Sequence, residues 1–262
     1  MTPGASRGAW RAGSRPTPQQ WRRLSIVALG VVVGFPLFTS LALTTQTSAH
    51  GAVVVTVLPA MTAVFAVLRA GERPPRTFWL AAATGLVSVL AFVAVTGAAR
   101  GALSPADLYL LAAIVLCGLG YAEGGALARE LGGARTICWA LLLSLPVTLT
   151  ITLVSAATHP PHGDARSWPA FAYLTVVSMF LGFFAWYAGL ARGGVARVGQ
   201  IQLAQPVLTL LWSALLLNET VPPAALAVAS LVLLCVILTQ RTRTAIKPAA
   251  AAAHKPHPAS RT

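Results

Sequence analysis

Charged residues are scarce in this 262-residue sequence, where they make up only 10% of the chain and just six are acidic. A soluble domain usually carries about a quarter charged residues, because its surface must face water. Hydrophobic residues make up 56%, and the mean hydropathy is +0.72. Since the shortage of charge extends over nearly the whole chain, the sequence predicts an integral membrane protein without a separate globular domain.

Motifs for metal binding, nucleic-acid binding and catalysis are also missing. The three cysteines lie inside apolar runs without CxxC spacing, which indicates small core residues rather than a disulfide or metal site. The net charge of +13 comes from arginines that lie between apolar runs, so we expect no nucleic-acid partner. Because a P-loop, GxSxG and HExxH are absent, an ATP-driven pump is excluded, and we expect neither an enzyme, a cofactor nor a metal.

Long apolar runs dominate what is present. A membrane-spanning helix needs roughly 20 apolar residues, whereas barrel strands are about ten residues long and alternate in polarity. The sequence therefore predicts an all-α bundle of about eight transmembrane helices. They are Leu24–Leu43, Ala52–Leu68, Phe78–Thr96, Leu108–Ala128, Ile137–Ala157, Trp168–Leu190, Val198–Leu217 and Pro222–Leu238.

The distribution of arginine and lysine sets the orientation. If the N-terminus is inside, 17 of the 19 basic residues fall in inside segments, and only Arg100 and Arg166 fall in outside loops. Cytoplasmic loops carry the excess of basic residues. We therefore expect a multi-pass protein of the plasma membrane with both termini in the cytoplasm. Residues 1–22 and 241–262 are predicted to be disordered basic ends.

Two stretches of the chain share one pattern of spacing. Pro59 is followed thirteen positions later by Glu72 and then by two prolines, and Pro206 is followed in the same way by Glu219 and two prolines. The predicted topology puts the first Glu-Pro-Pro loop inside and the second outside. The sequence thus predicts two inverted repeats, as in many secondary transporters, whose solute site lies near the membrane midplane. Pro59 and Pro206 are the expected helix breaks.

Three segments resemble the EamA-type family of the drug/metabolite transporter superfamily. They are TSAHGAVVVTVLPAMTAVFAVLRAGERPP, GYAEGGALARELGGAR and VSMFLGFFAWYAGLARGGVARVGQIQLAQPVLTLLWSALLLNE. The resemblance covers about Leu24 to Leu238 and implies a secondary transporter that exports small metabolites, amino acids or drug-like compounds.

The resemblance has one departure. Members typically have two inverted five-helix repeats, whereas here residues 107–240 hold five expected helices and residues 23–97 hold three. The family's first two helices are therefore expected to be absent, or to lie upstream of the assigned start. The helix equivalent to that of Glu123 would then be missing, and a homodimer or a second chain would have to supply it.

Polar residues within the apolar runs are the candidate solute ligands, because a polar side chain costs free energy when it faces lipid. Glu123 has two interpretations: it binds a cationic group or a coupling proton, or it pairs with an arginine at the cytoplasmic interface. Gln202 and Gln205 share one helix face and are predicted to line the solute path, together with Tyr121, Trp186 and Tyr187. Glu72 and Glu219 are interpreted as helix terminators and surface charges.

Two other functions remain open on the sequence. A membrane-embedded enzyme of lipid or polyprenyl-phosphate metabolism would group its charged residues at one membrane face, whereas here they look scattered. A non-transporting accessory subunit would account for the shortened first repeat. The main hypothesis is a secondary transporter with the lipid bilayer, a small solute and a coupling proton as its partners.

Overall fold

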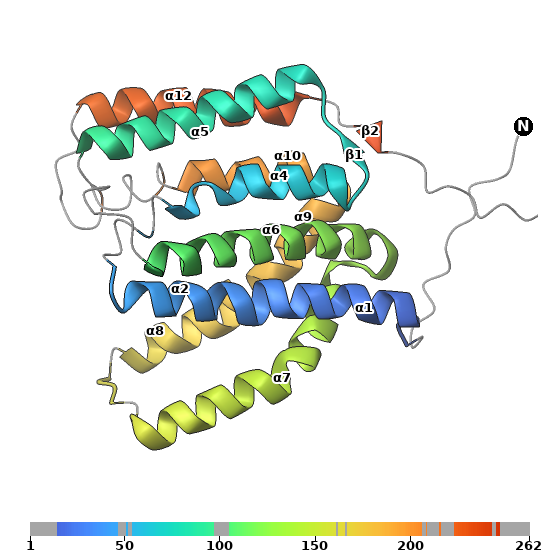
Figure 1. Ribbon diagram of the computed structural model, residues 1–262, viewed down its shortest axis with the longest axis vertical. Helices are drawn as coiled ribbons and strands as arrows, with labels where there is room; N and C mark the ends of the chain where they lie inside the picture. The colour runs from blue at the N-terminus through green and yellow to red at the C-terminus, as the bar shows by residue number, and fades with distance from the viewer. Residues whose placement is uncertain are drawn as a thin grey trace, which may run out of the picture.

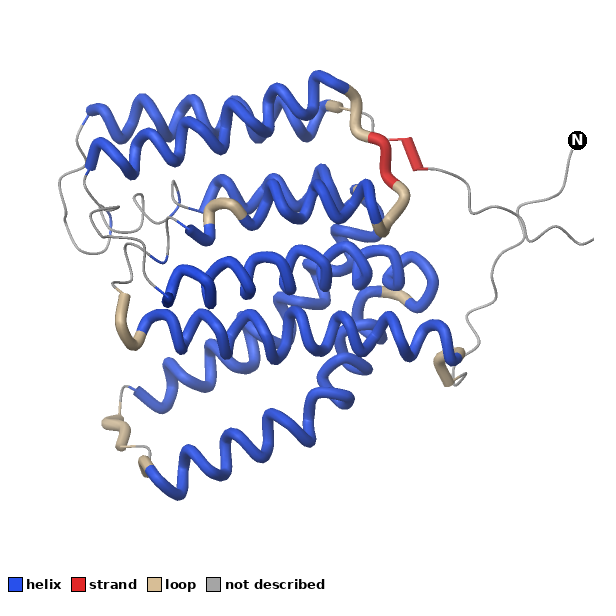
Figure 2. Tube along the Cα trace, viewed as in Figure 1, coloured by secondary structure: helices blue, strands red, loops and turns tan. Residues whose placement is uncertain are grey.

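The protein is a bundle of helices that lie alongside one another (Figures 1 and 2). A computed structural model describes residues 15–46, 51, 54–96, 105–160, 162–165, 167–205, 208, 215, 223–242 and 245–246. In this part of the chain, the β structure is limited to β1 (Glu72–Arg73) and β2 (Ala245–Ile246), which pair in antiparallel fashion. The predicted class of an all-α membrane protein is therefore confirmed.

The helices follow the chain in a simple order. Two of them are long and continuous, and in each a π-helical segment lies between two α-helical segments. In chain order the elements are α1 (Pro18–Val27), η1 (Ala28–Gly34), α2 (Phe35–Leu43), α4 (Leu58–Leu68), α5 (Arg76–Thr96), α6 (Pro105–Leu131), α7 (Gly133–Thr158), α8 (Ser167–Tyr173), η2 (Leu174–Leu181), α9 (Gly182–Gly193), α10 (Val195–Gly199), η3 (Gln200–Ala204) and α12 (Pro223–Arg241).

The described residues of the eight apolar runs are helical, apart from a turn at Thr56 and Val57 before α4. By length and composition, four of the described helices can cross a membrane, namely Pro18–Leu43, Pro105–Leu131, Gly133–Thr158 and Ser167–Gly193. The count of eight spans and the division into three plus five stay predictions.

The ends of the bundle differ in two places from the expected disordered segments. α1 begins at Pro18, inside the segment 1–22, because Thr17 and Gln20 form a reciprocal capping box. In the segment 241–262, Ala245 and Ile246 form β2 against the connection between α4 and α5.

The described arginines gather at one end of the bundle, on the right in Figure 1, which we call the basic end. It holds the start of α1, the α4–α5 connection, the α6–α7 and α9–α10 turns, and the end of α12. Its arginines include Arg23, Arg69, Arg129, Arg197 and Arg241. The charge pattern predicted these segments on one side of the membrane. Placement of that side in the cytoplasm stays a prediction.

Large hydrophobic side chains cover much of the exterior. On α7 and α8, for example, Leu153 is 60% exposed and Phe171 62% exposed. A water-soluble monomer rarely exposes so much contiguous apolar surface, whereas lipid solvates it well. This surface fits a bilayer as the surrounding medium.

α6 is the central helix and contacts the helix formed by α1, η1 and α2, as well as α4 and α9. Glycines allow the close approach on one side. A Cβ atom added to Gly30 would lie 2.3 Å from the carbonyl oxygen of Leu116, and one added to Gly120 would lie 2.7 Å from Val31 Cγ2. Small residues of this kind let transmembrane helices pack backbone against backbone.

Replacing Gly30 with alanine should therefore destabilise the bundle. The new methyl group would meet a backbone carbonyl that cannot rotate away, and such overpacking costs about 1–3 kcal/mol. Thermal unfolding in detergent measures the effect. Gly189→Ala is the matched control, because its Cβ would make only an ordinary contact at 3.7 Å. Equal melting temperatures for the two variants would contradict the close approach.

Candidate functional site

Four of the predicted site residues form one cluster near the middle of the bundle. The ring of Tyr121 on α6 lies edge-on to Trp186 and Tyr187 on α9, with ring centroids 5.4 Å and 6.4 Å apart. The side chains of Cys117 and Gln202 also interact with the Tyr121 hydroxyl group. We call Tyr121, Trp186, Tyr187 and Gln202 the central cluster.

Several polar atoms here are buried without a hydrogen-bond partner among the described residues. They are Trp186 Nε1, Tyr187 Oη and Gln202 Oε1, together with Thr62 Oγ1 on α4. A buried polar group without a partner costs about 1–3 kcal/mol. Because such atoms are rare in folded proteins, a group of them within one region indicates a place where water or a solute completes the hydrogen bonds.

Thr62 lies beside this cluster, and the sequence analysis did not single it out. A Cβ on Gly118, next to Cys117, would lie 3.2 Å from the backbone nitrogen of Thr62. A Cβ on Gly199, one turn before Gln202, would lie 2.9 Å from Thr62 Cγ2. These small residues let α4 approach α6 and α10. Nothing in the sequence marks a threonine in the Pro59 helix as a site residue.

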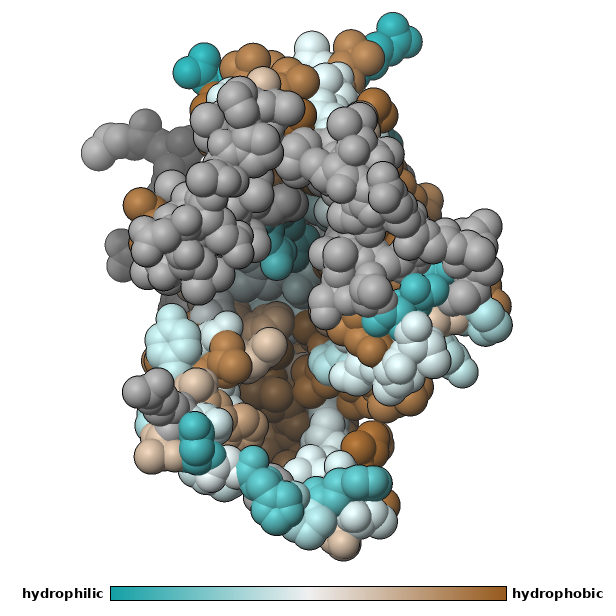
Figure 3. Space-filling model, turned by 90° about the vertical axis from the view of Figure 1, so that its left-hand side faces the viewer, coloured by the Kyte–Doolittle hydropathy of each residue, from teal (hydrophilic) through white to brown (hydrophobic). Residues whose placement is uncertain are grey.

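The molecule is hollowed at the end opposite to the basic end. Figure 3 looks at that end and shows a recess with hydrophobic side chains on its lower wall and hydrophilic ones deeper in its upper part. A largely apolar recess with a few polar groups is the usual form of a small-molecule site.

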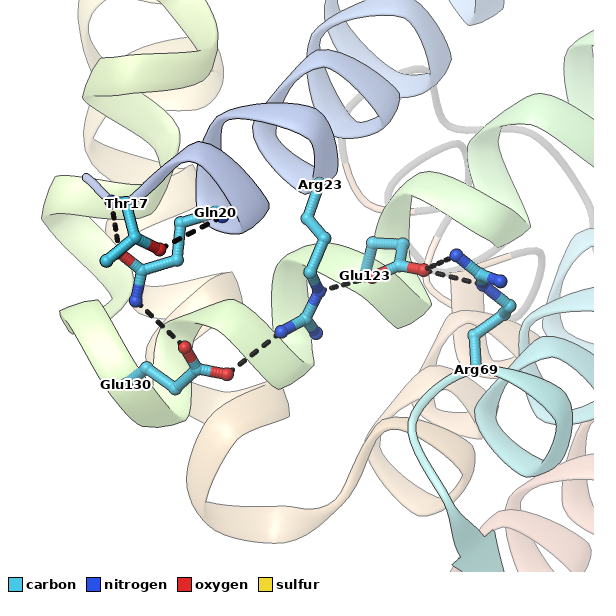
Figure 4. A network of polar contacts seen from close by, with 6 residues as sticks. All are labelled: Thr17, Gln20, Arg23, Arg69, Glu123 and Glu130. Atoms are coloured by element: carbon cyan, nitrogen blue, oxygen red, sulfur yellow. Dashed lines mark hydrogen bonds and ion pairs between the residues drawn. The ribbon is translucent and has the colours of Figure 1, made fainter. Parts of the chain in front are cut away.

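Glu123 lies two residues after Tyr121 on α6 and is held by two arginines (Figure 4). Its side chain is 2% exposed. Oε2 accepts a hydrogen bond from Arg23 Nε at 2.7 Å, and Oε1 accepts from Arg69 Nε at 2.6 Å. Arg23 also binds Glu130, at 2.9 Å. Of the two interpretations of Glu123, the geometry shows the arginine pairing, while its role toward a solute or proton stays a prediction.

Glu72 is not the surface charge that its position in a loop indicated. Its side chain is fully buried at the basic end. The carboxylate accepts hydrogen bonds from the backbone N–H groups of Val195 at 2.7 Å and Ala196 at 2.9 Å, and it pairs with Arg129. The matched Glu-Pro-Pro spacing of the two repeats was the signal that could have marked it as structural.

The other predicted residues are placed as follows. Pro59 lies in the first turn of α4, and its carbonyl oxygen accepts a hydrogen bond from the buried Gln200 at 3.0 Å. Gln205 is exposed, outside the central cluster, and its solute-lining role stays a prediction. Pro206 and Glu219 lie outside the described residues.

The arrangement separates two kinds of chemistry. The central cluster holds uncharged hydrogen-bonding and aromatic groups, whereas Glu72, Glu123 and Glu130 all lie at the basic end, each paired with an arginine. The charged residues are thus less scattered than the sequence indicated.

Comparisons with known proteins show what the whole chain resembles. A protein of Bacillus subtilis (strain 168) described as "Uncharacterized transporter YdeK" is 46% identical over 229 residues, which cover 86% of this chain and 78% of that protein. A solved structure described as "Crystal structure of protein" has a similar fold, with a TM-score of 0.67 at 20% identity over 88% of this chain and 80% of the other.

The family comparison covers most of the sequence. Residues 6–94 and 104–241 match the family described as "EamA-like transporter family". Two further features agree with membership, namely the apolar helices and a relative named as a transporter. The chain therefore belongs to the EamA-like transporter family.

Proposed function

We propose that this membrane transporter is a secondary transporter that exports small metabolites, amino acids or drug-like compounds and binds them at the central cluster. The observation that carries the proposal is the group of buried, unpartnered polar atoms on Thr62, Trp186, Tyr187 and Gln202. A solute that occupies this place would supply the missing hydrogen bonds. Export across the plasma membrane, from a cytoplasmic basic end, is the direction that the resemblance implied.

The chemistry of the cluster favours solutes without net charge. The free atoms of the cluster are an N–H donor on Trp186, an amide oxygen acceptor on Gln202 and the hydroxyl group of Tyr187. The hydroxyl group of Thr62 lies beside them, and both hydroxyl groups can donate or accept. The rings of Tyr121, Trp186 and Tyr187 offer flat apolar faces. Since the nearby carboxylate of Glu123 already has two arginine partners, a net cation would find no free counter-charge there. A neutral or zwitterionic molecule with a planar part fits best.

Glu123 is the candidate carrier of a coupling proton. A protonated carboxyl group no longer attracts Arg23 and Arg69 as an ion pair, so proton uptake would loosen the contact between α1, α4 and α6. The resemblance implied assembly with a second copy or another chain. Such assembly is compatible with this site, because the central cluster is formed within one chain.

Tyr187→Phe separates a binding role from a structural one. The hydroxyl group has no partner among the described residues, so its loss should leave the free energy of unfolding unchanged or raise it by up to about 1 kcal/mol. If the solute bonds this hydroxyl, apparent affinity should fall about five- to tenfold. Thermal unfolding and flux in proteoliposomes measure the two effects. The control is Tyr173→Phe, at an exposed tyrosine of α8. A loss of stability with unchanged affinity would contradict the assignment.

Gln202→Ala should raise the apparent KM for the transported solute, because it removes an acceptor of the central cluster. Flux is measured with a panel of neutral, zwitterionic and permanently cationic solutes, and we expect uptake into inverted vesicles for the first two classes. Gln205→Ala is the comparison, and an effect of similar size would extend the solute path to that residue. An unchanged KM for every transported solute in Gln202→Ala would contradict the proposed site.

Glu123→Gln should abolish proton-coupled flux while expression stays normal. The amide keeps the size of the side chain but neither carries the charge that pairs with Arg23 and Arg69 nor exchanges a proton. Solute flux driven by an imposed pH gradient checks this. Glu130→Gln is the matched control, since Glu130 is 47% exposed and binds only the outer part of the network. Wild-type flux in Glu123→Gln would remove this residue from the mechanism.

A further inference from the structure

The connection between α4 and α5 is held to the second half of the chain by the pairing of β1 with β2 and by one buried side chain, that of Glu72. Glu72 Oε1 accepts from Val195 N, Oε2 accepts from Ala196 N, and Arg129 of α6 approaches Oε1 from the other side. Hydrogen bonds that involve a charged partner are roughly twice as strong as neutral ones. This carboxylate thus joins three elements that are far apart in the sequence.

The backbone on the receiving side is shaped for the contact. Gly194 separates α9 from α10 and has a φ of 87°, a left-handed conformation that glycine adopts without strain. A Cβ atom on Gly194 would lie 3.5 Å from both carboxylate oxygens of Glu72. The turn therefore presents the two N–H groups of Val195 and Ala196 directly to the carboxylate.

The same elements surround the central cluster. α4 carries Thr62, α6 carries Tyr121, and α10 continues into η3, which carries Gln202. A solute that moves between the cluster and the basic end must pass between these helices. Their ends are held together by Glu72, while the opposite end of the molecule is hollowed (Figure 3).

We propose that Glu72 is a positioning residue that closes the basic end of the solute path, and that transport requires the release of its carboxylate from Val195, Ala196 and Arg129. We call this set of contacts the Glu72 latch. The role of Glu72 in transport rests on the transport function proposed above. The closure itself is present in the protein without solute. In the described structure the latch is shut.

The neighbouring network supports the closure without replacing it. Arg69, at the end of α4, binds Glu123 on α6, so α4 is held to α6 by an ion pair three residues before Glu72. α10 and the end of α12 are joined by Gln240, whose amide donates to the carbonyl oxygen of Arg197 at 2.6 Å. The side chain of Glu72 links the α4–α6 pair to α10 at the basic end, beside the pairing of β1 with β2.

The native Cys117 provides a probe of the closure. It is 1% exposed, and it lies beside Tyr121 in the interior. With Cys138 and Cys235 replaced by serine, a small anionic methanethiosulfonate reagent that cannot cross the bilayer reacts with Cys117 only when one end opens. The full chain is reconstituted in vesicles, and the reagent is supplied first on the side of the basic end and then on the other side.

We expect Glu72→Gln to raise the rate of Cys117 modification from the basic end by at least about tenfold, since the amide loses the ion pair and one N–H acceptor. The rate from the opposite end should fall, because the two open states compete. Glu130→Gln, the exposed carboxylate of the same region, should leave both rates unchanged. An unchanged rate in Glu72→Gln, or an equal rise from both ends, would overturn the proposal.

A second variant covers the case in which Glu72→Gln does not fold. Arg129→Gln removes one donor of the latch and leaves the two backbone N–H groups in place, so a smaller rise from the basic end is expected. No rise in a folded Arg129→Gln would also overturn the latch. Because the labelling needs no solute, its failure is distinguishable from failure of the transport proposal, which the affinity of Gln202→Ala tests.

Discussion

A carboxylate that is buried away from water needs hydrogen-bond donors from the protein. The basic end of this protein is organised around two buried carboxylates that have such donors. Glu72 and Glu123 are both buried, and each is bound by groups from at least two other elements. An unpaired charge in such a place would cost several kcal/mol. The positions of α1, α4, α6 and α10 relative to one another are therefore set by these two side chains.

The polar groups of the central cluster, in contrast, are not fully paired. The cluster keeps polar atoms without partners in the described part of the chain, and none of its members is charged. At the basic end the buried carboxylates are paired, although Arg129 Nε has no partner among the described residues. Paired carboxylates at one end and an under-satisfied centre fit a protein that must bind a molecule briefly and then release it. Were the central polar atoms fully paired with one another, a solute would have to break those bonds before it could bind.

Much of this was accessible from the sequence, because both the apolar runs and the arginine bias report directly on the membrane. The runs located the helices, and the polar and aromatic residues within the fourth, sixth and seventh runs led to four side chains that meet in space. Glu72 was misread because an acidic residue beside an arginine and two prolines is typical of a solvated loop. Its three donors come from residues 57, 123 and 124 positions away, and local patterns carry no information about them. Thr62 was missed for a related reason, since its neighbours Gly118 and Gly199 come from other helices.

The distance in sequence between Glu72 and its donors also sets the order in which the basic end assembles during synthesis. When the ribosome has completed α4 and α5, Arg129, Val195 and Ala196 do not yet exist, so the nascent chain holds a carboxylate whose donors have still to be translated. Because Glu72 lies in a connection between helices, its side chain stays in water until then. A lone charge in lipid would cost far more free energy. The basic end therefore assembles late, after α10 has inserted. A chain that ends before Val195 would leave Glu72 without its two backbone N–H donors.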